Sequence, residues 1–307
     1  MKVSIIGAGR NNNGIGEYIA KFFHKNKATV ISVLGTTTKT ARHAAARLKR
    51  YGIQASAYTD FYHMIEEERP DSVVIASPLP THFEYLIKSV DASLNVFCEK
   101  PFIWNKNDNQ QKLIDFIFQK AEGRNLKIAM NSQWPFSMPY YETLCGSIDR
   151  KKADTFFMHL SPMVAGKEMI LDSVPHALSI LYFALGKGKI IKTDIESYEK
   201  IIIIRFIYNT NSNDCEVLIR LEREERQPRS FKFGFNDKIV YRVLDLKDYD
   251  IYFKYFDRTL KVPDPLELSV KDFISSVKTK REPQIGKSHI IATDYMLKII
   301  YNCYENF

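Results

Sequence analysis

The chain has 307 residues, of which 45% are hydrophobic and 26% are charged, and its formal net charge at pH 7 is +8. This composition excludes a mainly disordered chain and a collagen-like fibre. No apolar stretch reaches the roughly 18 residues that a membrane-spanning helix needs, so we predict no membrane span. The length favours two domains, because a single hydrophobic core stops growing before this size.

The chain starts directly with a strand pattern at residues 1–6. It shows no basic segment followed by an apolar segment and a small-residue cleavage site, so we expect a cytoplasmic protein. The positive charge is spread out, and no nucleic-acid-binding motif accompanies it. We therefore expect a small-molecule partner that carries phosphate or acid groups, rather than nucleic acid.

Strands and helices alternate through the first 131 residues. Apolar runs predict strands at 2–6, 29–34, 55–58, 72–76, 95–98 and 127–131. Helical patterns are present at 16–24, 40–51, 61–68, 82–91 and 108–121. Repeated β-α units with continuous apolar strands predict an α/β fold, a doubly wound parallel sheet with helices on both faces.

The pattern changes after residue 131. Helices are predicted at 138–145, 172–184, 266–279 and 288–304. Between residues 190 and 260, polar and apolar residues alternate in strand-like segments at 189–198, 200–208, 215–222, 230–235, 238–246 and 250–256. This second part predicts an α+β arrangement, a large and mostly antiparallel open sheet with flanking helices.

A glycine-rich segment, GAGRNNNGIG, joins the first strand to the first helix. Gly7 allows a tight turn, Gly9 lets the backbone approach a pyrophosphate, and the helix N-terminus offers free N–H groups. The usual G-x-G-x-x-G spacing is broken, and if Gly14 is the third glycine the loop holds extra residues. A dinucleotide site is favoured over a turn without a ligand and over a methyltransferase loop. The residues assigned to the cofactor here are Gly7, Gly9, Arg10, Asn11, Asn12, Asn13, Gly14 and Ile15.

The residues after the second strand bear on the choice between NAD and NADP. An acidic residue there would bind the ribose 2′-hydroxyl of NAD. This chain instead has Thr36, Thr37, Thr38 and Lys39, with Arg42 one turn later. Hydroxyls and cations suit a 2′-phosphate, so we predict NADP ahead of NAD. The alternative is a polar loop in which Thr38 or Thr40 caps the next helix.

Three signatures together resemble the Gfo/Idh/MocA family of NAD(P)-dependent oxidoreductases, named after glucose-fructose oxidoreductase and inositol dehydrogenase. A strand is followed by Ser77-Pro78-Leu79-Pro80-Thr81-His82, another ends in Glu99-Lys100-Pro101, and the second part contains Asp172-x-x-x-His176. The resemblance implies a Rossmann domain over 1–127 and a substrate-binding and oligomerisation domain over 128–307, whose closing helices can pack back on the first. It also places Ser77, Pro78, His82, Glu99 and Lys100 at the cofactor.

The resemblance further implies that Lys100, Asp172 and His176 form the catalytic group. Lys100 follows the carboxyl end of a parallel strand, where open α/β sheets bind ligands, and its ammonium can stabilise an alkoxide. His176 can exchange a hydroxyl proton near neutral pH, and Asp172 shares its helix face. The alternatives are a surface cation and a polar surface pair. No residues supply further metal ligands, so we predict no metal site.

Two departures from the family pattern concern the same motif. Val174 stands where the family often has glycine, and Ser179 where it often has a second aspartate. Pro175 could also begin the helix, in which case Asp172 or Ser173 would cap it.

Further expectations concern the substrate, the oligomer and the activity. Gln133 and Trp134 are assigned to the substrate, with Trp134 equally suited to the core. The resemblance implies hydride transfer between the cofactor and a carbonyl or secondary alcohol of a sugar, cyclitol or related molecule. The alternatives are an NAD-dependent glycosidase of the same fold and a non-catalytic dinucleotide-binding regulator. The resemblance also implies a cis Lys100–Pro101 peptide.

A homodimer or homotetramer is expected through the outer face of the sheet, to which we assign Phe231, Phe233, Tyr241, Tyr252 and Phe256.

Overall fold

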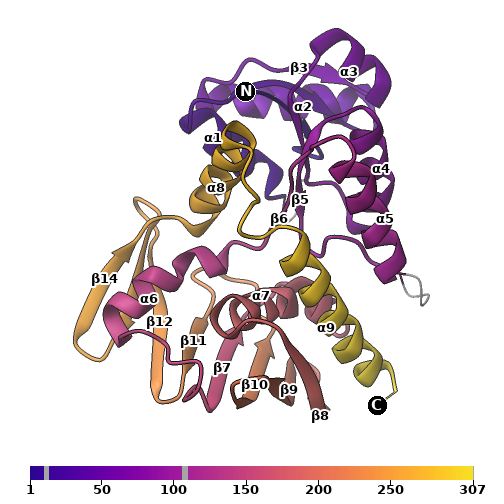
Figure 1. The fold of residues 1–307 in the computed structure, drawn as a ribbon. Coiled ribbons are helices and arrows are strands. Elements are labelled where there is room, and N and C mark those ends of the chain that lie inside the picture. Colours follow the sequence, from indigo (N-terminus) through magenta and orange to yellow (C-terminus); the bar gives the residue numbers. More distant parts are fainter. Residues whose placement is uncertain (10–13, 106–109, 307) are drawn as a thin grey trace. The chain divides into compact units, whose positions relative to one another are not determined.

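A computed structural model describes residues 1–9, 14–105 and 110–306 of the chain (Figure 1). The chain forms two compact units, one of Met1–Asn131 with Leu266–Ile290 and the other of Ser132–Pro265 with Ile291–Phe307. This division differs from a boundary at residue 127/128, because the strand at 128–131 pairs within the first sheet. The segment 266–290 also belongs to the first unit, so this unit is discontinuous in sequence.

The first unit is built on a six-stranded parallel sheet in the order β3-β2-β1-β4-β5-β6. Its strands are β1 (Lys2–Ile6), β2 (Thr29–Leu34), β3 (Ser56–Tyr58), β4 (Ser72–Ile75), β5 (Asn95–Glu99) and β6 (Ile128–Asn131). The chain leaves β1 for β2 on one side and returns to β4 on the other, so the carboxyl ends of β1 and β4 mark a switch point. Open α/β sheets bind their ligands at such a point. The predicted doubly wound sheet is confirmed.

Helices cover both faces of this sheet. They are α1 (Gly16–Lys25), α2 (Thr38–Leu48), α3 (Phe61–Glu68), α4 (His82–Asp91), α5 (Gln110–Glu122) and α8 (Pro265–Thr279). In Figure 1, α4 and α5 lie on one side of β5 and β6, and α1 and α8 lie on the other. Phe97 of β5 and Phe273 of α8 have ring centroids 5.3 Å apart within one hydrophobic core. The closing helix α8 therefore completes the core of the first unit.

The second unit holds an eight-stranded sheet in the order β14-β13-β12-β11-β7-β10-β9-β8. Its strands are β7 (Thr155–Leu160), β8 (Gly188–Ser197), β9 (Ile201–Thr210), β10 (Asp214–Glu222), β11 (Phe231–Phe235), β12 (Lys238–Asp245), β13 (Asp250–Tyr255) and β14 (Arg258–Val262). Only β7 and β10 pair in parallel among these described strands, so the mostly antiparallel sheet is confirmed. The sequence segments listed above lack β7 and β14. The β7 sequence, TFFMHL, does not alternate between polar and apolar residues.

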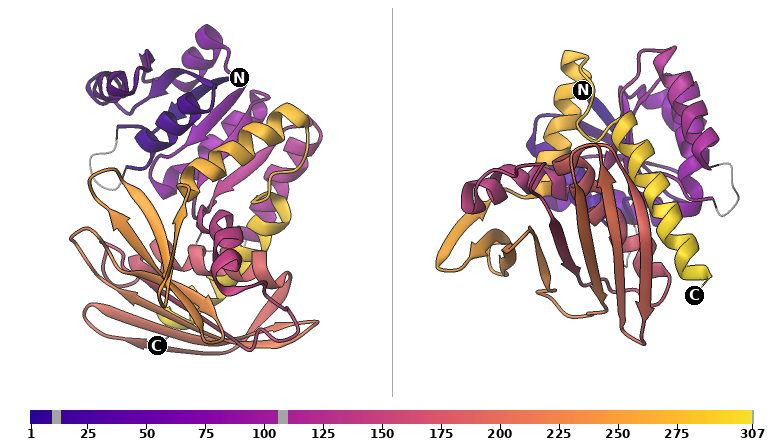
Figure 2. Two further views of the ribbon diagram at one scale, coloured as in Figure 1. Left: turned by 90° about the vertical axis from the view of Figure 1, so that its left-hand side faces the viewer. Right: turned by 60° about the horizontal axis from the view of Figure 1, so that its bottom comes forward.

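Helices of the second unit lie on one side of its sheet, and no helix of the described chain covers the other side (Figure 2). They are the 3-10 turn η3 (Trp134–Ser137), α6 (Met138–Cys145), α7 (Glu168–Leu185) and most of α9 (Lys287–Glu305). The uncovered side is called the outer face below, and the helix side the inner face. Residues 167–185 are long and apolar enough to cross a membrane, but 61% of that segment is buried in the fold. A core helix has the same composition, so this is weak evidence for a span.

Two sequence expectations in this unit are wrong. α7 begins at Glu168 and holds Pro175 in its interior, so the helix does not start at Pro175 and Asp172 does not cap it. Phe231 and Phe233 are 3% and 0% exposed on the inner face, rather than on the outer face. The alternation along β11 places them beside buried Phe235, because every second residue of a strand points to the same side.

Candidate functional site

The glycine turn after β1 is shaped by close backbone approaches. Gly7 has φ 89°, and a Cβ on it would lie 2.6 Å from the Cα of Ser77 at the end of β4. A Cβ on Gly9 would lie 3.1 Å from the carbonyl oxygen of Thr40 in α2. A side chain at Gly7 would collide with the backbone just after β4, and one at Gly9 would make a tight contact with α2. The backbone of the turn is therefore left bare, as a pyrophosphate site requires.

Gly16 fills the role that the sequence offered to Gly14. It is the first residue of α1, and a Cβ on it would lie 3.0 Å from Ala8 Cα and 3.1 Å from Ala76 Cβ. This contact is the close helix–strand packing that the third glycine of the fingerprint provides. Residues 10–15 then separate it from Gly9, where the usual fingerprint has two residues. Arg10, Asn11, Asn12 and Asn13 lie outside the described residues, and Gly14 and Ile15 lead into the helix.

The N-terminus of α1 suits an anionic group. Its N-cap residue, Ile15, makes no side-chain capping hydrogen bond, so among the described residues no N-cap side chain occupies the first N–H groups of the helix. Glu17 in the first turn is 1% exposed and would repel a phosphate. However, Arg47 and Arg50 pair with its carboxylate, and the Tyr51 hydroxyl donates to it at 2.9 Å. The negative charge of Glu17 is thus compensated beside the turn.

The segment after β2 is exposed over Thr36–Lys39, and Arg42 is exposed one turn later. Thr37 is the N-cap of α2: its Oγ1 accepts from the Thr40 N–H at 3.2 Å, and its own N–H donates to Thr40 Oγ1 at 3.0 Å. The capping alternative therefore holds for Thr37 rather than for Thr38 or Thr40. The Lys39 and Arg42 side chains are the charged groups that this segment presents to solvent.

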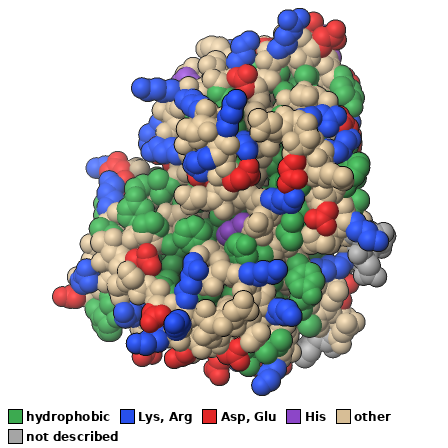
Figure 3. All heavy atoms as spheres, in the orientation of Figure 1, with side chains coloured by type: hydrophobic (Ala, Val, Ile, Leu, Met, Phe, Trp, Pro, Cys, Tyr) green, Lys and Arg blue, Asp and Glu red, His purple; other side chains and the backbone are tan. Residues whose placement is uncertain are grey.

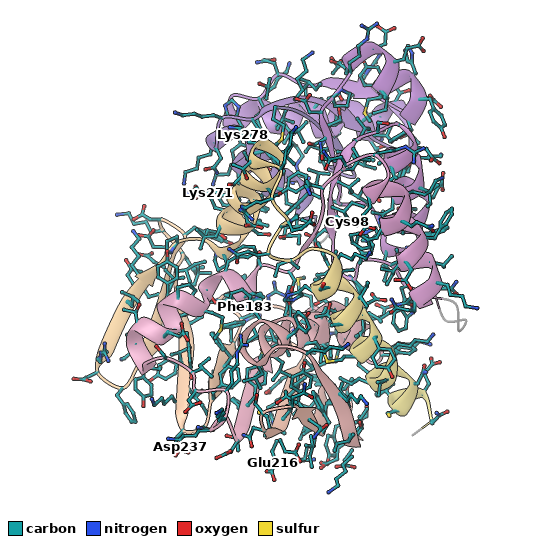
Figure 4. All side chains as sticks on the ribbon, in the orientation of Figure 1. Cys98, Phe183, Glu216, Asp237, Lys271 and Lys278 are labelled. Carbon is teal, nitrogen blue, oxygen red and sulfur yellow. The ribbon has the colours of Figure 1, made fainter. Side chains whose placement is uncertain are left out.

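His82 joins the ends of β4 and β5 inside the first unit. It is 1% exposed, with Nδ1 3.0 Å from the Pro101 carbonyl oxygen and Nε2 3.0 Å from the Ser77 carbonyl oxygen. The thiol of Cys98, labelled in Figure 4, lies 3.7 Å from the same Nδ1. Ser77, for its part, pairs its Oγ with the Thr81 hydroxyl at 2.7 Å. These contacts fix the loop that carries Lys100 against the loop that follows β4.

Lys100 follows β5 directly, at the carboxyl edge of the sheet. Glu99 and Lys100 are half-buried, and the side-chain amide of Asn131, at the end of β6, donates to the Glu99 carboxylate. The Lys100–Pro101 peptide is cis, as the resemblance implies. The first unit thus brings Gly7, Ser77, Glu99 and Lys100 to one edge of the sheet.

Asp172 and His176 lie one turn apart along α7 in the second unit, and both are half-buried. The Ser173 hydroxyl donates to the Asp172 carboxylate at 3.2 Å. Pro175 has no N–H, so the helix continues past it without the hydrogen bond that this residue would donate to Leu171. The α7 segment packs on β7, β10 and η3.

Trp134 and Gln133 open the second unit. Trp134 is 5% exposed, and its ring stacks on Phe231 with centroids 3.9 Å apart, so the tryptophan is part of the inner-face packing. Gln133 is half-buried, and its Oε1 has no hydrogen-bond partner in the part of the chain that the structure describes. The turn η3, which contains Trp134, packs on α7 and so places these residues in the same unit as Asp172 and His176.

Sequence reasoning missed Arg242 of β12. Its guanidinium carbon lies 5.7 Å from the Trp134 ring centroid and 5.4 Å from that of Phe231. The signal was present, because Arg242 falls in phase with Val240 and Leu244 in an alternating strand and so occupies an inner-face position. On the face that Figure 3 shows, lysines and arginines are scattered over the surface with acidic side chains among them.

Comparison with known proteins identifies the first unit. Residues 1–122 match the model of an oxidoreductase family with an NAD-binding Rossmann fold, GFO_IDH_MocA. An inositol 2-dehydrogenase from Klebsiella pneumoniae is 36% identical over 144 residues, which cover 46% of this chain and 38% of that enzyme. The matched stretch is thus well under half the length of that relative.

Solved structures are similar over nearly the whole chain. A UDP-N-acetylglucosamine 3-dehydrogenase from Acidithiobacillus ferrooxidans has a TM-score of 0.75 and 17% identity, covering 100% of this chain and 98% of that one. A 3-ketoreductase from Actinomadura kijaniata in complex with NADP has a TM-score of 0.71 and 14% identity, covering 98% and 97%. At this identity the likeness shows a shared fold. Together with the family match over residues 1–122, it confirms the resemblance to the Gfo/Idh/MocA family of oxidoreductases that was noted in the sequence.

Proposed function

We propose that this chain is an NAD(P)-dependent oxidoreductase that moves a hydride between the cofactor and a carbonyl or secondary alcohol of a sugar, cyclitol or related molecule. The observation that carries the proposal is the carboxyl edge of the first sheet, where a bare glycine turn and a helix N-terminus stand beside Glu99 and Lys100. The sequence similarity to inositol 2-dehydrogenases points to the same substrate class.

The cofactor fits the residues that are present. Gly7 and Gly9 carry no side chains, and the N-cap residue Ile15 makes no side-chain hydrogen bond to the α1 N-terminus, so this turn would hold the pyrophosphate. When bound, the nicotinamide supplies or accepts the hydride. The side chains of the chain orient the substrate and move the accompanying proton.

In this proposal, Lys100 donates a hydrogen bond to the substrate oxygen, stabilises the negative charge that develops on it and relays a proton. His176 exchanges the hydroxyl proton: it takes the proton when the alcohol is oxidised and returns it when the carbonyl is reduced. Asp172 positions the substrate or the imidazole. On oxidation, the alcohol gives one hydride to the cofactor and one proton to His176. On reduction, the carbonyl compound receives both from the same two groups.

Substitution of the two proton-handling residues tests the proposal. We expect Lys100→Met or His176→Ala to lower turnover by roughly 10²- to 10⁴-fold, with dinucleotide affinity nearly unchanged. Lys100→Arg should also fail, since a guanidinium does not release a proton at working pH. The assay is steady-state reduction of NAD and NADP with a panel of sugars, sugar phosphates and cyclitols.

The matched control is Lys88→Met, a lysine of the same unit that pairs with Glu84 on α4. It should keep wild-type turnover. Near-wild-type turnover in both the Lys100 and His176 variants would contradict the assignment of these residues. Failure of the wild type to bind any nicotinamide dinucleotide would contradict the function itself.

We propose NADP as the preferred cofactor. The exposed Lys39 and Arg42 stand after β2, and the segment from Gly35 to Arg42 contains no acidic side chain. Such a pair of cations attracts the 2′-phosphate that distinguishes NADP. A 3-ketoreductase of similar fold solved in complex with NADP supports this proposal, whereas another structure of similar fold holds NAD+.

We also propose that the chain self-associates through the outer face of the eight-stranded sheet. Tyr241 and Val243 of β12 are 38% and 45% exposed there. Half-buried apolar residues of β7, β9 and β10 lie on the same face: Phe157, Ile203, Ile207 and Leu218. An open apolar sheet face of this kind is typical of subunit interfaces. A strictly monomeric mass by light scattering at micromolar concentration would contradict it.

A further inference from the structure

Arg242 occupies an apolar position in the second unit. Along β12 it lies between Val240 and Leu244 on the inner face, and across the ladder it pairs with Phe253, which is fully buried. Hydrophobic side chains are the rule at such positions, because a buried charge loses its hydration. A cation at this point of a regular alternating strand breaks the local pattern, and such breaks concentrate at functional sites.

A second arginine lies beside it. The Arg242 Nη2 donates to the Arg229 carbonyl oxygen at 2.8 Å, and the Arg229 Nη1 donates to the Ser161 carbonyl oxygen at 3.3 Å. Both arginines are half-buried. Backbone carbonyls therefore hold the two guanidinium groups in place while using only part of their donor capacity, since each guanidinium has five N–H donors.

Among the residues that the structure describes, neither of these arginines has a carboxylate partner. Within residues 1–9, 14–105 and 110–306, no acidic oxygen lies within 4.0 Å of either guanidinium. Arginines nearby in sequence behave differently: Arg220 pairs with Glu222 at 2.9 Å and Arg223 with Glu225 at 2.8 Å. The positive charge of the Arg229–Arg242 pair is thus uncompensated at close range, in contrast to that of its neighbours.

The electrostatic environment agrees with this picture. Burial and the neighbouring charge of Arg229 lower the pKa of Arg242 to about 10. Tyr249, Asp264 and Glu224 act in the opposite direction at longer range, but they do not restore the usual value. The site would gain free energy from a bound anion, because an anion would offset both the desolvation and the mutual repulsion of the two cations.

A buried hydroxyl accompanies the pair. Ser161, whose carbonyl holds Arg229, is 7% exposed, and its Oγ has no hydrogen-bond partner among the residues that the structure describes. Buried polar groups without partners are rare in folded proteins and call for an explanation. Ser161 also begins the connection from β7 to α7, the helix of Asp172 and His176.

We infer that Arg242 and Arg229 form a subsite for an oxyanion substituent, a carboxylate or a phosphate, on the substrate. The inference rests on the proposed function and narrows its substrate class to acidic or phosphorylated sugars and cyclitols. Trp134 supports the subsite from η3, which packs on α7, so the cations and the proposed acid/base residue belong to one unit. A planar guanidinium pairs with carboxylate and phosphate oxygens through two parallel hydrogen bonds, which gives both affinity and orientation.

The test measures binding of inorganic phosphate, glucose 6-phosphate, glucuronate and neutral glucose by calorimetry in the presence of saturating NADPH. We expect the phosphorylated or the carboxylated compound to bind the wild type at least about tenfold more tightly than glucose. Arg242→Met should remove most of this preference, and Arg242→Lys should retain part of it because the charge remains. The compound that binds more tightly identifies which oxyanion the subsite takes.

The matched control is Arg220→Met, on the outer face of the same sheet, which should behave as the wild type. Retention of NADPH binding shows in each variant that the protein is folded. Equal affinity of wild type and Arg242→Met for all four probes would overturn the inference. If the oxyanion preference depends on Arg242 but no compound is oxidised or reduced, the subsite stands and the proposed function fails. If only neutral sugars are turned over, and Arg242→Met does not affect that turnover, the proposed function stands and the subsite fails.

Discussion

The two sheets of this protein present polar chemistry in different places. In the interior of the six-stranded sheet, the hydroxyls of Ser4 and Ser32 form a hydrogen bond with each other at 2.7 Å. The charged residues Glu99 and Lys100 lie where β5 ends. In the eight-stranded sheet a charged residue, Arg242, stands within a strand, on the helix side. A parallel sheet covered on both faces can expose functional groups only at its edge. A sheet with a helix layer on only one face can also carry functional groups within its strands.

The largest effect is expected from the covered interior of the parallel sheet. Phe97 is fully buried, and its ring lies 5.8 Å from that of Phe23 and 5.3 Å from that of Phe273. We expect Phe97→Ala to lower the free energy of unfolding by about 3–5 kcal/mol, because it leaves a cavity between two helices and a strand. Urea unfolding of the purified protein measures it.

Phe116→Ala is the control, since Phe116 is 46% exposed on α5 and should change stability little. A loss of less than about 1 kcal/mol in Phe97→Ala would contradict a rigid, tightly packed interior. Such a small loss would weaken the contrast between the interior of the six-stranded sheet, which is purely structural, and its carboxyl edge, which carries the candidate site.

The second prediction concerns the segment that closes the β6 edge of the same sheet. The Met130 N–H donates to the Ile285 carbonyl at 3.0 Å, and His289 follows at 4% exposure. Burial lowers the pKa of His289 to about 3. Below pH 6.5 the unfolded chain therefore binds a proton at this histidine that the folded chain does not bind. The free energy of unfolding falls for this reason as the pH drops from 6.5 toward 3. The expected loss is roughly 1 kcal/mol per pH unit.

Unfolding free energies at several pH values between 4 and 7 check this slope. His289→Gln should flatten it, whereas His43→Gln, at an exposed position on α2, should leave it unchanged. If His289→Gln keeps the wild-type slope, other titratable groups cause the pH dependence, and the segment with Ile285 and His289 is not the acid-sensitive part of this edge.

The smallest effect is expected at the exposed first turns of α2, which follow β2. We expect the double substitution Lys39→Ala with Arg42→Ala to weaken NADP binding by roughly tenfold and to leave NAD binding unchanged, because exposed charge pairs contribute about 1 kcal/mol. Dissociation constants for both cofactors measure it, with Lys49→Ala as an exposed control in the same unit. Tighter binding of NAD than of NADP by the wild type would contradict the assignment and leave only the glycine turn as a cofactor determinant at this edge.

Local patterns were sufficient for the elements of the first unit. The helices at 61–68 and 82–91 and the strand at 29–34 have the bounds that periodicity and flanking breakers predict. β7 could not be predicted in the same way, because six residues without alternation do not separate a strand from other buried segments. It is the pairing with β10 and β11 that makes this segment a strand.

The candidate site shows the same limit. The turn glycines and the Glu99-Lys100-Pro101 signature are visible in the sequence, but the helix-packing role of Gly16 depends on Ala8 and Ala76, which only the fold brings to it. Pro175 indicated a helix start, yet the helix runs through it because its apolar side is buried against the sheet. Tertiary burial outweighs the hydrogen bond that proline removes.

The sequence by itself determined the order of the β-α units, the ends of the strands that carry Gly7 and Lys100, and the family resemblance. These properties depend on residues close together in the chain, whose spacing already specifies a turn, a strand or a helix. Only the tertiary structure decided that Phe231 faces inward, that Arg242 lies beside Arg229 with no carboxylate partner in the described parts of the chain, and that residues 266–290 complete the first core. Those outcomes depend on contacts between residues far apart in the chain, and their free energy exists only once the sheets have formed.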